Sequence, residues 1–205
     1  MARPSQAKEN LIKAASDLIW ESSYGSTSVD DICERACVRK GSFYHFFESK
    51  AHLAIATIDN TWAKRLPVLN EIFSPLVPPL ERFNRYSCAM LEYQEERRSL
   101  TGHVCGCPLS SLGSEVGTQD ELIRSKIAEI FAHHLRFYES AIRDAATEGF
   151  IDGTEPAFKA RTIQTYIQGA FTQARVLNDL TPIRLLDRAI LAILGVDPDR
   201  VSAST

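Results

Sequence analysis

Two groups of side chains in this chain of 205 residues have the types and spacing that binding or chemistry requires. The first is the stretch VRKGSFYHFF, residues 38–47, in which two cations, a hydroxyl and an imidazole accompany aromatic rings. Guanidinium and ammonium groups bind phosphate, so a helix that exposes them can contact a polyanion. The second is the segment HVCGCP, residues 103–108, where an imidazole and two thiols lie close together.

The segment 103–108 permits three interpretations. Imidazole and thiolates are ligands for zinc or copper, but only three such groups lie together and the C-x-C spacing is tighter than in common zinc motifs. Alternatively, Cys107 begins a predicted short helix, whose dipole favours a thiolate that reacts with oxidants or electrophiles. In the third interpretation, which the sequence favours, Gly106 and Pro108 shape a helix start and the cysteines fill small spaces. We assign no metal and no cofactor.

The stretch 38–47 divides its residue types between two sides of one short helix. Phe43, Phe46 and Phe47 are expected to bury inward and fix the angle of the helix. The remaining side chains lie on or near the other face. From Arg35 to Lys50 the sequence has four cations and one carboxylate, although the whole chain carries a formal net charge of −3. A local cationic surface on an acidic protein is the electrostatic footprint of a nucleic-acid interface.

The elements around this stretch are those of a helix-turn-helix. Ser28 is predicted to cap a short helix together with Asp31, in a variant of the capping box. A turn around Cys37-Val38 then leads into the helix of residues 38–47. In this geometry the second helix lies in the major groove of DNA, and unpaired N–H groups at helix N-termini bind phosphate.

We predict nine DNA-binding residues. Thr27 and Ser28 are expected to reach one phosphate strand and Tyr44 and Lys50 the other, while Gly41 lets the backbone approach the duplex closely. The full set is Thr27, Ser28, Arg39, Lys40, Gly41, Ser42, Tyr44, His45 and Lys50.

The rest of the chain also has helical periodicity, which predicts an all-α protein. Pro67 is expected to kink or end the fourth helix, before a proline-rich break at residues 74–79. Residues 118–121 form a predicted capping box that opens a long helix ending at Gly149, and residues 181–195 form the last helix.

Composition excludes several classes of protein. Apolar stretches are too short to span a bilayer, no signal peptide is recognisable, and a cytoplasmic location is expected. The chain has no Gly-rich phosphate loop, no H-E-x-x-H and no G-x-S-x-G, and it is therefore not expected to be an enzyme. A helical enzyme or an interaction module without DNA binding is the weaker alternative.

Residues 26–50 resemble the DNA-binding segment of the tetracycline-repressor (TetR) family, whose members carry the pattern T-x-x-x-I-A-x-x-A-G-V-x-x-G-x-x-Y-x-x-F-x-x-K. Cys37 occupies the turn position where the family usually has glycine, and Cys33 stands where alanine is common. Cysteine enters a left-handed conformation less easily than glycine, so the turn is strained if it requires that conformation; we expect instead that it avoids the conformation and tolerates a small side chain. Cys37 is expected to have a packing role, with a redox role as the alternative.

The resemblance implies a fold and a mechanism. Residues 1–50 are expected to form a three-helix DNA-binding domain, and residues 51–205 a larger helical domain for effector binding and dimerisation, with about nine helices in all. The protein is then a homodimeric repressor that a small molecule releases from a palindromic operator. A thiol sensor of electrophiles or oxidants acting through Cys105 and Cys107 is the alternative.

Two features of the larger half are assigned from spacing. A stripe with coiled-coil-like steps is predicted to form the dimer seam, unless it packs inside the monomer. Its members are Ile163, Ile167, Ala170, Ala174 and Leu177, joined by Ile183, Leu186, Ile190 and Ile193. Polar and aromatic residues at core-facing positions are candidates for the effector site, although ordinary packing accounts for each: Tyr86, His103, Cys107, His134, Tyr138, Tyr166 and Gln173.

Overall fold

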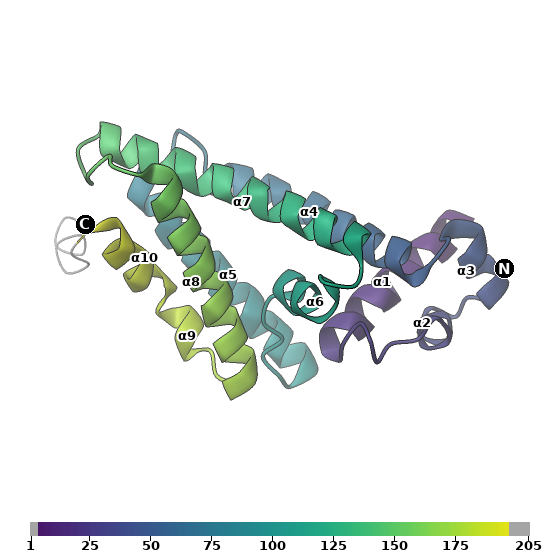
Figure 1. Cartoon of the computed structure of the whole chain (residues 1–205). Coiled ribbons are helices and arrows are strands. Elements are labelled where there is room, and N and C mark those ends of the chain that lie inside the picture. The colour runs from purple at the N-terminus through teal and green to yellow at the C-terminus, as the bar shows by residue number, and fades with distance from the viewer. Residues whose placement is uncertain (1–3, 197–205) are drawn as a thin grey trace. The chain divides into compact units, whose positions relative to one another are not determined.

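A computed structural model describes residues 4–196, and this part of the chain is built from helices without strands. Figure 1 shows the helices coloured along the chain, and residues 4–196 contain ten of them. Their bounds are α1 Pro4–Glu21, α2 Val29–Ala36, α3 Lys40–Phe46, α4 Lys50–Ile72, α5 Pro79–Thr101, α6 Pro108–Val116, α7 Glu121–Thr147, α8 Pro156–Leu177, α9 Thr181–Arg184 and α10 Leu186–Leu194. The predicted all-α class is confirmed. None of the described helices is long and apolar enough to cross a membrane.

The helices form two compact units. The first contains the described residues up to Arg65 together with Pro108–Ile130, and the second contains Leu66–Cys107 together with the described residues from Phe131 onward. The boundaries between the units fall inside α4, at the start of α6 and inside α7. Each unit has a core of its own.

In the first unit, α1, α2 and α3 share one hydrophobic core. Helix α1 contributes Leu11, and α2 contributes Ile32, both fully buried. Phe43 of α3 and Phe47 just after it lie in the same core, with ring centroids 5.9 Å apart. Burial of a phenyl side chain stabilises the fold by about 1.5–3 kcal/mol, so these rings fix the orientation of α3.

In the second unit, Phe73 at the end of α4 lies at the centre of an aromatic cluster. Its ring centroid is 5.4 Å from that of Phe137 and 5.8 Å from those of Tyr86 and Tyr138. These residues come from α5 and α7, so the cluster joins three helices. A buried arginine, Arg82 of α5, lies in this unit and pairs with Asp144 of α7 at 2.5 Å.

Helix α4 continues through Pro67 to Ile72, so of the two effects expected of this proline, the end of the helix does not occur. Two further expectations about helix ends are wrong in detail. The cap of α7 is Asp120, whose Oδ1 accepts a hydrogen bond from the Ile123 N–H at 3.0 Å, so the helix begins two residues later than a box capped by Thr118 predicts. The last predicted helix is divided at Leu185 into α9 and α10.

The predicted dimer seam lies mostly inside the second unit, which corrects its assignment. Ile163, Ile167 and Ala174 of α8 are buried within the single chain. So are most of their predicted partners in α9 and α10: Ile183, Leu186 and Ile190. Leu177 and Ile193 are the exceptions, because Leu177 is 64% exposed and Ile193 is half-buried. The spacing identified a buried stripe correctly, but the stripe packs against the chain's own helices.

Candidate nucleic-acid interface

The first turn of α2 is fixed by a complete capping box. The Ser28 side chain accepts a hydrogen bond from the Asp31 N–H at 3.1 Å, and the Ser28 N–H donates to Asp31 Oδ2 at 2.7 Å. Hydrogen bonds from the Ser28 hydroxyl and N–H hold the pKa of the Asp31 carboxyl below its usual value. The predicted cap is confirmed, and Ser28 is exposed at the start of α2.

The turn between α2 and α3 has a left-handed residue at Cys37, with φ 53° and ψ 40°. The Cys37 N–H donates to the Glu34 carbonyl at 3.0 Å and the Val38 N–H donates to the Cys33 carbonyl at 2.9 Å, which together form a Schellman motif. The expectation that the turn avoids the left-handed conformation is therefore wrong. Cys37 is also exposed, so packing does not explain the cysteine.

Replacing Cys37 by glycine is expected to stabilise the protein by about 1 kcal/mol, because a left-handed conformation costs an L-residue about that much. Cys37→Val is expected to destabilise it, since a β-branched side chain fits this conformation poorly. Thermal unfolding of the two variants measures both effects. Equal melting temperatures for glycine and valine would contradict the conformational explanation.

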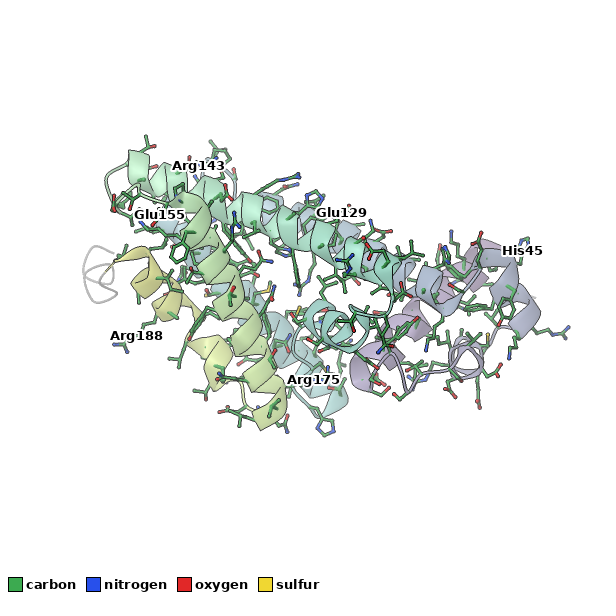
Figure 2. All side chains as sticks on the ribbon, in the orientation of Figure 1. His45, Glu129, Arg143, Glu155, Arg175 and Arg188 are labelled. Atoms are coloured by element: carbon green, nitrogen blue, oxygen red, sulfur yellow. The ribbon has the colours of Figure 1, made fainter. Side chains whose placement is uncertain are left out.

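Helix α3 exposes the predicted polar face. Arg39, Lys40 and His45 are exposed, and the Tyr44 side chain is 56% exposed. The Ser42 side chain is half-buried. Figure 2 labels His45 on this helix. On the other side of α3, Phe43 and Phe47 are buried and Phe46 is partly buried, so the predicted division between the two sides is as expected.

Lys40 has an ion-pair partner within the first unit. Its ammonium lies 2.8 Å from a carboxylate oxygen of Asp30 in α2, and both side chains are largely exposed. The hydrogen bond that Lys40 donates to the Asp30 carboxylate raises the pKa of Lys40, so the ammonium stays protonated. An exposed pair of this kind contributes little to stability, and the ammonium is free to exchange its carboxylate for a phosphate.

Thr27 and Lys50 point toward the protein. Thr27 is buried, and its hydroxyl donates to the Ser23 carbonyl at 2.7 Å. The Lys50 ammonium donates to the Tyr24 and Thr27 carbonyls at 2.9 and 3.0 Å, and burial lowers its pKa. Both side chains therefore hold the loop between α1 and α2.

Nothing within the described part of the chain requires a glycine at position 41. A Cβ atom at this position would have nothing within 4 Å, and the residue is not among those with positive φ. An external surface that approaches the backbone of α3 closely is one reason for a side chain to be absent here.

Comparison with known proteins decides the family. Residues 11–57 match the family model of bacterial regulatory proteins of the tetR family, and residues 79–190 match that of the tetracyclin repressor-like C-terminal domain. The chain belongs to the TetR family. TetR-family proteins are DNA-binding transcriptional regulators and not enzymes, and the expected function class is thus confirmed.

The relatives of this TetR-family regulator cover most of its length. An uncharacterised HTH-type regulator from Lactococcus lactis is 30% identical over 176 residues, which cover 84% of this chain and 85% of that protein. The transcriptional regulator AcuR of Cereibacter sphaeroides is 29% identical over 176 residues, 84% of this chain and 78% of that protein. The crystal structure of a TetR regulatory protein from Rhodobacter sphaeroides matches with a TM-score of 0.79 and 26% identity, over 90% of this chain and 96% of that one.

The seven candidate effector residues of the regulator do not form one site. Tyr86, His134 and Tyr138 belong to the aromatic cluster, with the Tyr138 ring centroid 5.6 Å from Tyr86 and 6.3 Å from His134. Tyr166 and Gln173 instead line a shallow groove on α8 and α9. His103 is exposed after α5, and Cys107 is half-buried before α6. Spacing along a helix cannot distinguish these locations.

The segment before α6 is held by side chains that sequence analysis missed. The Gln94 amide donates to the Gly106 carbonyl at 2.9 Å and accepts from the Gly106 N–H at 3.2 Å. Arg175, labelled in Figure 2, donates to the Cys105 carbonyl at 3.0 Å. Across residues 4–196, no group of three or more His, Cys, Asp or Glu side chains is arranged to hold a metal ion.

Proposed function

We propose that this TetR-family regulator is a homodimeric repressor that binds a palindromic operator through the exposed face of α3. Residues 1–50 carry DNA binding in this proposal, and residues 51–205 carry effector binding and dimerisation. The observation that supports it best is the division of α3, since Phe43 and Phe47 anchor the helix while Arg39, Tyr44 and His45 face outward. Such a helix can enter a major groove without disturbing its own core.

The proposed DNA contacts divide into two kinds. Arg39, Lys40, Ser42, Tyr44 and His45 contact the duplex with their side chains, and Gly41 gives close approach of the backbone. At the α1–α2 loop, Ser28 presents the N-terminus of α2 to a phosphate. Thr27 and Lys50 act by holding that loop, because their polar atoms already bind backbone carbonyls.

Selection from a random duplex library tests this function. The full-length protein is expected to enrich a two-fold symmetric sequence whose half-sites lie about one helical turn or a multiple apart. Affinity for the enriched duplex is expected to fall steeply with salt concentration, because phosphate contacts release counterions. A protein that enriches no sequence at low or physiological salt would not be the proposed repressor.

The outer face of α8 is the proposed dimer surface. Tyr166, Val176 and Leu177 are exposed apolar side chains on this helix, and Leu185 is exposed beside α9. Exposed apolar surfaces of this kind mark sites of association. An operator reader with two-fold symmetry needs a second copy, and a second copy covers this face.

Tyr166→Glu is therefore expected to convert the dimer to a monomer, because it places a charge at the centre of an apolar interface. Leu76→Glu is the matched control, since Leu76 is 94% exposed in the loop between α4 and α5. Sedimentation velocity gives the mass of each variant. A dimeric Tyr166→Glu protein, indistinguishable from the control, would refute this surface.

The effector site is proposed in the aromatic cluster of the second unit, around Tyr86, His134 and Tyr138. Two buried polar atoms of this unit, Ser87 Oγ and Gln164 Oε1, have no hydrogen-bond partner. Buried polar groups are nearly always hydrogen-bonded, so these two atoms are available to a ligand that binds in this unit. An aromatic compound fits a site formed by the rings of Tyr86, His134 and Tyr138.

A thiol response through Cys105 and Cys107 is the second candidate. It is favoured by the accessibility of Cys107, which is half-buried, and by the fixed backbone of the segment that carries it. Mass spectrometry after mild oxidation distinguishes the two candidates. Release of DNA that accompanies modification of Cys107, and that Cys107→Ser abolishes, supports the thiol sensor.

A further inference from the structure

The loop between α1 and α2 is held by a carboxylate from a distant part of the sequence. The Glu115 side chain of α6 accepts a hydrogen bond from the Tyr24 N–H at 3.0 Å and another from the Gly25 N–H at 2.5 Å. One carboxylate oxygen serves each donor. All three residues belong to the first compact unit.

The same loop is held by a cation. Lys50 of α4 donates to the carbonyls of Tyr24 and Thr27, and its ammonium lies 4.0 Å from the centroid of the Tyr24 ring. Two N–H groups of the loop are thus bound by an anion, and two of its carbonyls are bound by a cation. Hydrogen bonds to charged groups are about twice as strong as those between neutral groups, so this loop is firmly fixed.

This arrangement sets the position of the first turn of α2. The loop ends at Thr27, and the next residue is the cap Ser28. Any change in the path of residues 24–27 moves the N-terminus of α2, where a phosphate contact is proposed. A loop that is already ordered loses less conformational freedom when DNA binds, which favours affinity.

We infer that Glu115 is a positioning residue for DNA binding, which acts by holding the α1–α2 loop and without touching DNA itself. The inference rests on the proposed function, because it names a residue on which the operator contact depends. The inference also explains why the proposed DNA-binding unit carries the Glu115 carboxylate. Two backbone N–H groups bind this carboxylate and offset its negative charge.

Gly25 provides an independent way to disturb the same contact. A Cβ atom at position 25 would lie 2.7 Å from Glu115 Oε1, and the other neighbour within 4 Å is the carboxylate carbon of the same side chain. The glycine is not among the residues with positive φ, so alanine adds no backbone strain. Gly25→Ala therefore acts by displacing the Glu115 carboxylate.

A double-mutant cycle on full-length protein tests the inference, with the selected duplex as the probe. Glu115→Ala and Gly25→Ala are each expected to weaken binding about tenfold, through loss of a preorganised loop. The double variant is expected to bind no more than about twofold more weakly than Glu115→Ala, because alanine at position 25 then meets no carboxylate. Glu121→Ala is the control, since Glu121 is an exposed carboxylate of the same unit that pairs with Arg124.

The salt dependence of binding separates positioning from direct contact. The slope of log Kd against log salt is expected to be the same for Glu115→Ala and the wild type, because no phosphate contact is removed. Amide hydrogen exchange of Tyr24 and Gly25 is expected to accelerate in Glu115→Ala, while the exchange of Phe43 remains slow. Fast exchange throughout α1–α3 would instead indicate a merely structural role and overturn the inference.

The outcomes distinguish this inference from the proposed function. If the wild-type protein enriches a duplex but Glu115→Ala binds it equally well or more tightly, the inference fails and the function stands. Additive effects of Glu115→Ala and Gly25→Ala would also overturn it. If the wild-type protein enriches no duplex, both fail.

Discussion

Arg82→Met is expected to lower the free energy of unfolding by about 3 kcal/mol, at the low end for a broken buried ion pair because Asp144 is partly exposed. The Arg82 side chain is 2% exposed. Its Nε donates to the Val77 carbonyl at 2.8 Å and its Nη1 to Asp144 at 2.5 Å. Methionine fills a similar volume but cannot donate, so a loop carbonyl and a carboxylate lose their donor.

Arg85→Met is the matched control for this prediction. Arg85 lies on the same helix and pairs with Glu81 at 3.1 Å, but both side chains are about half exposed. An exposed pair of this kind contributes less than about 1 kcal/mol. Urea denaturation of the two variants gives the comparison, and equal losses of stability would mean that Arg82 does not anchor the α4–α5 loop.

Arg39→Ala is expected to weaken binding of the selected duplex by about 10- to 100-fold, which is the range for loss of an arginine contact to a base or phosphate. Arg39 is exposed at the N-cap of α3, and its side chain makes no capping hydrogen bond. The substitution is therefore expected to leave stability within about 0.5 kcal/mol of the wild type. Fluorescence anisotropy with a labelled duplex measures the affinity.

Arg143→Ala removes the same charge from a different part of the protein and serves as the control. Arg143 is exposed on α7, pairs with Glu139 at 2.9 Å and belongs to the second unit. Its loss is expected to change affinity by less than about twofold, since no DNA contact is proposed for Arg143 and an exposed charge that makes no contact is screened at physiological salt. If Arg143→Ala weakened binding as much as Arg39→Ala, net charge and not α3 would explain the affinity.

Local signals predicted most of the fold. The Ser28–Asp31 cap, the stretch of three phenylalanines and the helical periodicity depend on residues within a few positions of one another, and each has the predicted structural effect. The error at α7 arose because two neighbouring residues, Thr118 and Asp120, can both cap a helix. The family pattern has glycine at the position of Cys37, and the left-handed conformation that glycine favours is retained there despite the substitution, contrary to the expectation from the cysteine side chain.

Contacts between distant residues could not be predicted. Glu115 lies about 90 positions from the loop it holds, and Arg82 lies 62 positions from Asp144. Both are ordinary charged residues on helices, and no local pattern distinguishes them from solvated ones. Periodicity likewise finds a buried stripe on α8 without telling which surface covers it, and for that reason the chain's own core was mistaken for the dimer seam.

Hydroxyl-radical footprinting of the protein with and without the selected duplex tests the central claim most directly. Tyr44 and His45 lie on the exposed face of α3, and His103 is an exposed residue of the second unit. The account predicts that the duplex strongly reduces oxidation of Tyr44 and His45 and leaves that of His103 unchanged. Oxidation of Tyr44 and His45 at the rate of the free protein, in a sample where the duplex is fully bound, would contradict it.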